Sequence, residues 1–153
     1  MASLQVKHEW DEVMPSNITQ LSKYRPHQTC LIVEDSEFDR QKMTRVMNRS
    51  RQPFHIEVAA TLKSARRAME KVQVSLILLD NNLPDGLGAD FALELSRDPH
   101  FANIPVIIIS DWPSPFMWEK ASSAGVAYVL SKTEFDGRYV HAVLQANQEK
   151  RLN

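Results

Sequence analysis

The sequence has little that would direct the protein to an oxidising compartment or to a membrane. Cys30 is the only cysteine among 153 residues, so no disulfide can form within the chain. Its place at the start of the apolar run CLIV favours a small buried hydrophobe over a reactive thiol. The opening residues MASLQVKHEWDEVM lack the apolar centre of a signal peptide, and no apolar run approaches the length of a transmembrane helix. We therefore expect a cytoplasmic protein that makes no membrane contact.

An excess of charge of either sign is also missing. The chain has 18 Lys and Arg against 19 Asp and Glu, which gives a net charge of -1. Such a balance creates no strong field for nucleic acid or anionic lipid, so we expect no nucleic-acid partner. A length of 153 residues leaves room for a single domain with a substantial core.

From residue 28 onward, short apolar runs alternate with helical patterns, which predicts an α/β fold with a parallel sheet. The expected strands are residues 29–34, 55–60, 75–80, 105–110 and 127–130. The expected helices are residues 37–49, 62–72, a segment around Phe91 and Leu95, residues 115–125, and a last helix that starts near Arg138 and ends in a polar tail. This pattern divides the chain into an N-terminal extension at 1–27, a domain at 28–150 and a tail at 151–153.

Residues 1–27 do not follow the alternation. Val6, Trp10, Val13 and Met14 have the spacing of a short amphipathic helix, which Pro15 would end. The extension is either a docking segment, for its own domain or for a partner, or a frayed end.

Polar side chains end the predicted strands. Glu34 and Asp35 end the first strand, Asp80 ends the third in SLILLDNNLPDG, and Ser110 ends the fourth. Because the carboxyl ends of parallel strands meet at one edge of a sheet, we expect these side chains to lie close together. Lys132 follows the fifth strand and would join them.

Such a cluster needs a counterion. Two carboxylates about 4 Å apart repel each other by roughly 4 kcal/mol at an effective dielectric constant of 20. Mg²⁺ prefers oxygen ligands and would offset this charge, while the Lys132 ammonium and the Ser110 hydroxyl suit a phosphoryl group. Taken singly, the residues also have ordinary structural readings: a helix cap for Asp35, a turn for Asn82 and a surface cation for Lys132.

The ordered series VEDS, LLDNNLPDG, PVIIIS and LSK resembles the receiver domain of two-component response regulators, the CheY-like family. The resemblance covers residues 28–150. It implies a flavodoxin-like fold, in which a five-stranded parallel sheet of order 2-1-3-4-5 has helices on both faces. It also implies a phosphoryl group received from a sensor histidine kinase or a phosphotransfer protein, and an unidentified downstream protein that reads the signal.

The resemblance assigns a role to each residue of the cluster. Asp80 is the phosphoacceptor, and Ser110 and Lys132 contact its phosphoryl group. Glu34, Asp35, Asp80 and the backbone carbonyl of Asn82 bind Mg²⁺. On this reading the protein is a single-domain response regulator, and it is not an enzyme beyond its own phosphorylation and dephosphorylation.

The sequence departs from the family pattern at three positions. Val129 stands where an aromatic residue is usual, and the neighbouring Tyr128 would point to the opposite face of its strand. Thr133 replaces a common proline. Asp111 follows Ser110 where a small residue is normal, and it would point at the phosphoryl group, face solvent or cap the next helix. Asp111 and Val129 favour the main alternative, a pseudo-receiver that binds partners without phosphorylation. A more distant alternative is a magnesium-dependent phosphohydrolase with Asp80 as nucleophile.

Aromatic residues gather in the last third of the sequence. Phe116, Trp118, Tyr128 and Tyr139 fall on the helix near 115–125, the strand at 127–130 and the last helix. Aromatic residues are enriched at interface hot spots. This face is therefore the predicted surface for a downstream partner or for a homodimer.

Overall fold

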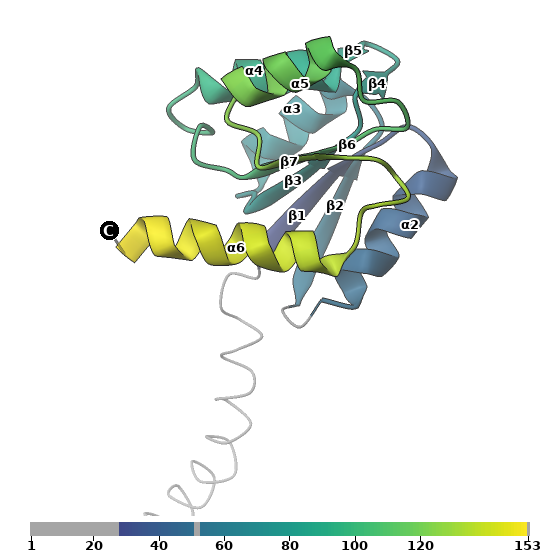
Figure 1. Ribbon diagram of the computed structural model, residues 1–153. Helices are drawn as coiled ribbons and strands as arrows, with labels where there is room; N and C mark the ends of the chain where they lie inside the picture. The colour runs from purple at the N-terminus through teal and green to yellow at the C-terminus, as the bar shows by residue number, and fades with distance from the viewer. Residues whose placement is uncertain (1–27, 51–52, 153) are drawn as a thin grey trace, which may run out of the picture.

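The central element is a five-stranded parallel sheet (Figure 1). The computed structural model describes residues 28–50 and 53–152, so the predicted extension at 1–27 lies outside the described residues. The strands are β1 (Gln28–Val33), β2 (Phe54–Ala59), β3 (Leu76–Leu79), β6 (Val106–Ile109) and β7 (Tyr128–Leu130). Their order is β2-β1-β3-β6-β7, which confirms the predicted order 2-1-3-4-5. Every residue of β3 and β6 is buried, because helices cover both faces of these central strands.

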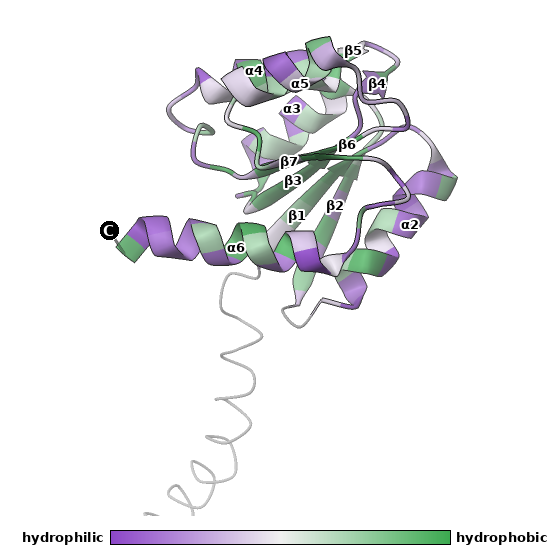
Figure 2. Cartoon of the chain, in the orientation of Figure 1, coloured by the Kyte–Doolittle hydropathy of each residue, from purple (hydrophilic) through white to green (hydrophobic). Residues whose placement is uncertain are grey.

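Five helices of the described residues form two layers around the sheet (Figure 1). The helices are α2 (Glu37–Asn48), α3 (Leu62–Lys71), α4 (Gly88–Ser96), α5 (Pro115–Ser123) and α6 (Gly137–Leu152). Helices α3, α4 and α5 cover one face, and α2 and α6 cover the other. In Figure 2 the strands are mainly hydrophobic and the helices carry most of the hydrophilic positions. No helix in residues 28–50 and 53–152 is both long and apolar enough to cross a bilayer.

Two segments of the chain differ from the sequence prediction. The stretch that follows β3 forms a small antiparallel hairpin of β4 (Asn82–Leu83) and β5 (Gly86–Leu87), where we expected an irregular loop. Helix α6 continues through Leu152 and includes most of the expected polar tail. Glutamine, alanine, glutamate, lysine and arginine in that stretch are good helix formers, and no proline interrupts them.

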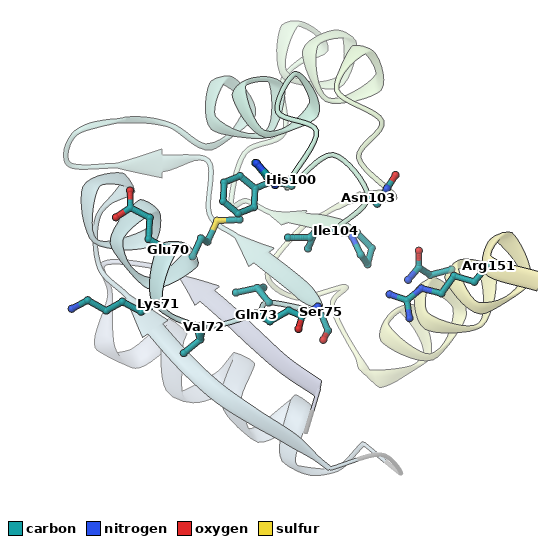
Figure 3. Close-up of a pocket in the computed structure, with 14 residues that line it drawn as sticks. Glu70, Lys71, Val72, Gln73, Ser75, His100, Asn103, Ile104 and Arg151 are labelled. Atoms are coloured by element: carbon teal, nitrogen blue, oxygen red, sulfur yellow. The ribbon is translucent and has the colours of Figure 1, made fainter. Parts of the chain in front are cut away.

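The amino edge of the sheet holds a groove of about 410 Å³. Figure 3 shows side chains from the end of α3, the start of β3, the α4–β6 loop and the end of α6 around it. Ser75 and Pro105 line this groove directly before β3 and β6 begin, so it lies at the edge opposite the strand ends that carry Asp80 and Ser110.

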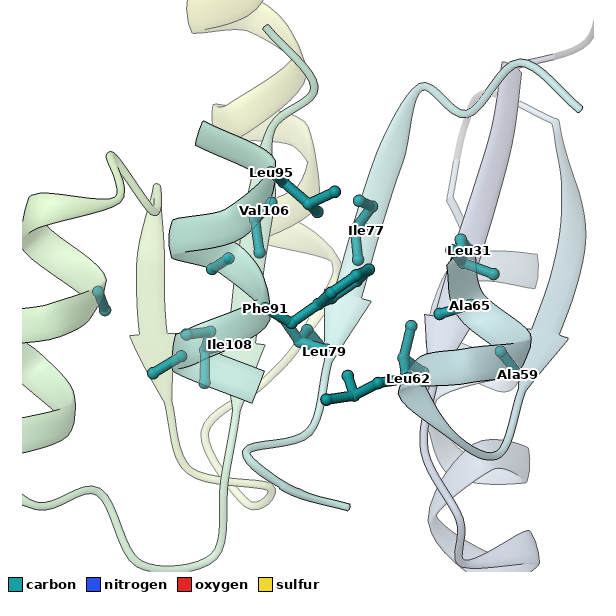
Figure 4. Close-up of a cluster of buried hydrophobic side chains, with 14 of the residues drawn as sticks. Leu31, Ala59, Leu62, Ala65, Ile77, Leu79, Phe91, Leu95, Val106 and Ile108 are labelled. Atoms are coloured by element: carbon teal, nitrogen blue, oxygen red, sulfur yellow. The ribbon is translucent and has the colours of Figure 1, made fainter. Parts of the chain in front are cut away.

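The hydrophobic core has two halves, one on each face of the sheet. Phe91 of α4 lies in the first half together with Ile77, Leu79 and Leu95 (Figure 4). Cys30 lies in the second half, which α2 and α6 cover. Complete burial raises the pKa of the Cys30 thiol, so this residue is the inert hydrophobe that the sequence predicted.

Candidate functional site

The carboxyl edge of the sheet brings three carboxylates together. Val33 and Leu79 are partners in the pairing of β1 with β3, so Glu34 and Asp80 follow at the same level. Glu34 and Asp80 are buried, and Asp35 is exposed. One oxygen of each of these three side chains lies within 4.8 Å of the others. The predicted acidic cluster is therefore present.

The turn between β1 and α2 holds the first two of these acids in place. The backbone N–H of Ser36 donates to Oε1 of Glu34 at 3.2 Å, and the Ser36 hydroxyl accepts from the N–H of Asp39 as the cap of α2. Arg40 donates to the carbonyl oxygens of Glu34 and Asp35 at 3.1 and 3.2 Å. These two bonds were not predicted, because a half-buried arginine near the start of a helix carries no distinctive sequence signal.

Burial dominates the electrostatics of the acid pair. Burial raises the pKa of Glu34 to about 8, and the nearby charge of Asp80 acts in the same direction. Burial also raises the pKa of Asp80, although a hydrogen bond with Glu34, the charge of Lys132 and backbone N–H groups of Asn82 and Asn81 oppose this shift. The pKa values of both carboxyl groups are raised although Lys132 is nearby, so the site has too little positive charge to keep both ionised. A cation with oxygen ligands would supply the missing charge.

Lys132 supplies the positive charge in the described part of the site. Its side chain is 12% exposed, and its ammonium group lies within ion-pair distance of four carboxylates. The distances from Nζ are 2.7 Å to Asp39, 3.4 Å to Glu34, 3.5 Å to Asp111 and 4.0 Å to Asp80. Burial alone would lower the pKa of Lys132, but the hydrogen bond to Asp39 and the surrounding carboxylates raise it above its usual value. Lys132 therefore stays charged at neutral pH.

A short turn after β7 presents this lysine. The backbone N–H of Ser131 donates to the Glu134 carboxylate at 3.2 Å, and the N–H of Glu134 donates to the Ser131 hydroxyl at 3.1 Å. The hydroxyls of Ser131 and Thr133 lie 3.0 Å apart, within hydrogen-bond distance. Thr133, which replaces the common proline, thus takes part in the turn.

Ser110 is fully buried at the end of β6, next to the strand that carries Asp80. Within residues 28–50 and 53–152, its hydroxyl oxygen has no hydrogen-bond partner, and the same holds for Oε2 of Glu34. Buried polar atoms are normally satisfied. Two unsatisfied ones at this edge fit a site that receives a polar ligand.

Asp111 leans toward Lys132 although its side chain is 58% exposed. The N-cap of α5 is Ser114, whose hydroxyl accepts from the N–H of Met117 at 3.2 Å. The interpretation of Asp111 as the helix cap is therefore wrong, and its carboxylate belongs to the surroundings of the lysine.

The connection from β3 to α4 is closely packed against Asp80. Asn81 accepts from the N–H groups of Gly88 and Ala89, at 2.8 Å through its carbonyl and 2.9 Å through its side chain. A Cβ on Gly88 would lie 2.2 Å from the carbonyl oxygen of Asp80, so only glycine fits there. Asn82 is exposed at the start of β4, and its carbonyl as a metal ligand stays a prediction.

The hairpin that follows Asp80 is tied to a second helix. The Asp85 carboxylate accepts from the backbone N–H groups of Leu62 and Lys63, at 2.8 and 3.0 Å, at the start of α3. These bonds hold the pKa of Asp85 below its usual range. The contact spans 23 and 22 residues, so spacing in the sequence gave no sign of it.

The position that usually holds an aromatic has a buried aliphatic side chain. Val129 packs in the core half that faces α3, α4 and α5. Tyr128 points to the other face, where its ring meets that of Tyr139 edge to face at 5.1 Å. Phe116 and Trp118 of α5 are exposed.

Comparison with known proteins identifies the family to which this fold belongs. The sequence profile described as "Response regulator receiver domain" matches residues 30–144. The chain belongs to this family. No curated protein matches this chain closely enough to count as a relative.

Solved structures with the same architecture are numerous. A two-component response regulator from Legionella pneumophila is 25% identical, with a TM-score of 0.68 over 80% of this chain and 98% of that one. A CheY-like receiver from Methanospirillum hungatei is 18% identical, with a TM-score of 0.69 over 82% and 97%. The Mn²⁺-bound form of the response regulator Rcp1 is 22% identical, with a TM-score of 0.65 over 76% and 88%.

Proposed function

We propose that this receiver domain accepts a phosphoryl group on Asp80 in a Mg²⁺-dependent reaction. Receiver domains are phosphoacceptors that interact with histidine kinases or phosphotransfer proteins. The observation that carries the proposal for this chain is the buried Asp80, grouped with Glu34 and Asp35 and facing Lys132.

The donor set fits a hard divalent cation. Three carboxylate oxygens lie within 4.8 Å of one another, and one buried oxygen of Glu34 has no partner among the described residues. The relative Rcp1 has a Mn²⁺-bound form. Glu34, Asp35, Asp80 and the Asn82 carbonyl would hold Mg²⁺, which when bound supplies positive charge against the oxygens of the transferring group.

The transfer is a displacement at phosphorus. A carboxylate oxygen of Asp80 attacks the phosphorus of a phosphohistidine, the P–N bond breaks, and its electron pair returns to the imidazole, which takes up a proton. Lys132 stabilises the charge on the phosphoryl oxygens, and the unpaired Ser110 hydroxyl donates to one of them. Attack of water on the same phosphorus later restores the Asp80 carboxylate.

The output surface is proposed on α5, β7 and α6. Phe116 and Trp118 are exposed there, whereas Tyr128 and Tyr139 pack on each other. A downstream protein or a second copy of the chain would bind this face. Because Val129 replaces the usual aromatic, the coupling that this aromatic provides in the family does not carry over to this chain.

The decisive experiment is incubation with Mg²⁺ and acetyl phosphate, followed by intact-mass analysis. We expect one added phosphoryl group on the wild type and none on Asp80→Asn, while Asp136→Asn, at a half-buried aspartate before α6 that pairs with Arg138, serves as a positive control. Calorimetry should show that Asp35→Ala loses most Mg²⁺ affinity. A wild type that never gains a phosphoryl group but still binds Mg²⁺ would support the pseudo-receiver.

A further inference from the structure

The shortest contact of Lys132 is with a residue outside the proposed phosphoryl site. Nζ donates to Oδ2 of Asp39 at 2.7 Å, whereas the nearest Asp80 oxygen is 4.0 Å away. The lysine expected to serve the phosphoacceptor is therefore hydrogen-bonded to a carboxylate on the first turn of α2. The contact joins positions 93 residues apart.

The pair is shielded and fixed. The side chains of Lys132 and Asp39 are 12% and 20% exposed, so water screens their attraction less than it screens an ion pair on the open surface. The backbone N–H of Asp39 donates to the Ser36 hydroxyl, which anchors this residue at the start of α2. A cavity of about 10 Å³, large enough for one water at most, borders both side chains.

We infer that Asp39 is a positioning residue that competes with the phosphoryl group for Lys132. This inference rests on the proposed function of Asp80. In the unphosphorylated protein the ammonium group lies closer to Asp39 than to Asp80, and a phosphoryl group must draw the lysine from this partner. Asp39 thereby lowers the affinity of the site for the phosphoryl group and keeps the unmodified state favoured.

Asp111 is a weaker competitor of the same kind. Its carboxylate is 3.5 Å from Nζ and 58% exposed, so solvent and salt screen its attraction for the lysine. Of these two carboxylates, Asp39 is closer to the lysine and better shielded, so it has the larger effect.

The first test measures binding of beryllium fluoride, a phosphoryl mimic, in the presence of Mg²⁺ by titration calorimetry. Asp39→Asn keeps the shape of the side chain and removes its charge, and we expect affinity for the mimic to rise on the order of fivefold, within the usual range of pairwise couplings. Asp39→Glu keeps the negative charge and should bind the mimic with wild-type affinity. Glu37→Gln removes an exposed carboxylate from the same helix turn and should change affinity less than about twofold. Equal or lower affinity for Asp39→Asn would overturn the inference.

The second test separates action through the lysine from direct repulsion of the anion. In a Lys132→Met background, with Mg²⁺ present to offset the acidic cluster, Asp39→Asn should no longer raise affinity for the mimic. A gain as large as that in the wild-type background would mean that Asp39 acts on the anion directly. Circular dichroism of each variant establishes that it is folded before it is titrated.

The two proposals fail in different ways. If wild type gains no phosphoryl group from acetyl phosphate, the proposed function fails whatever Asp39 does. If wild type is modified on Asp80 and Asp39→Asn is modified at the same rate with the same affinity for the mimic, only the inference about Asp39 fails.

Discussion

Two connections flank the proposed site, and they are built differently. The one from Asp80 to Gly88 forms a hairpin, ties itself to α3 through Asp85 and meets α4 without space for a Cβ. The one from Ser110 to Ser114 is held at its ends, by the N–H of Ser110 on the Leu130 carbonyl and by the cap of α5, and its exposed Asp111 pairs with Lys132 at 3.5 Å. Between those ends Trp112 is 85% exposed.

Under the proposed function, the difference separates two tasks. A nucleophile must be held in a fixed position for in-line transfer, so the segment that carries Asp80 gains from being tied at several points. A segment that reports a new charge must have a second arrangement available, and few internal bonds make this possible. The loop after Ser110 has few internal bonds. Three predictions test this contrast.

The largest effect is expected where the packing is tightest. Gly88→Ala places a Cβ against the carbonyl of Asp80, and the resulting strain should lower the free energy of unfolding by about 1–3 kcal/mol. Gly137→Ala is the matched control, because a Cβ added at Gly137 would meet no atom within 4 Å. Urea denaturation measures both. Equal stability of the two variants would contradict the close packing of the first connection.

A smaller, pH-dependent effect is expected at the tie to α3. Since the folded protein holds the pKa of Asp85 below its usual range, the ionised carboxylate stabilises the fold above the unfolded pKa of about 3.9, and this contribution is lost as pH falls through the folded pKa. Asp85→Asn should therefore melt at a lower temperature than wild type at pH 7, with the gap narrowing in acid. Thermal melts followed by circular dichroism from pH 7 to pH 3 measure the gap. A constant gap would mean that the charge of Asp85 has no part in it.

The smallest effect is expected in the loop after Ser110. Trp112→Ala removes a side chain that is 85% exposed, so the free energy of unfolding should change by less than about 0.5 kcal/mol. Urea denaturation under the conditions used for Gly88→Ala makes the comparison direct. A loss as large as that of Gly88→Ala would show that this loop is as firmly packed as its counterpart.

The sheet and the members of the site were predictable because each depends on local sequence. Continuous apolar runs indicate buried parallel strands, and the residue that ends each run lies at the carboxyl edge whatever the details of the loops. This reasoning located Asp80, Ser110 and Lys132 at the strand ends. Their chemical roles stay predictions.

The partners of these residues were not predictable. Asp39 meets Lys132 across 93 residues, and Asp85 meets Leu62 across 23, so neither contact leaves a periodic signal. Both depend on where α2 and α3 begin once they have packed on the sheet. The hairpin of β4 and β5 was also missed, because two-residue strands are too short for an alternating pattern.

The groove at the amino edge also shows where the two ends of the described domain lie relative to the acidic cluster. The backbone N–H of Ser75 donates to the carbonyl oxygen of Thr29 in β1, so Ser75 lies beside the start of β1. Ser75 also lines the same groove as Arg151, near the end of α6. Both ends of the described domain therefore emerge at one edge, and the acidic cluster occupies the other. Sequences that join the described domain at Gln28 or at Leu152 would start on the far side of the sheet from Asp80, so they would leave its acidic edge open.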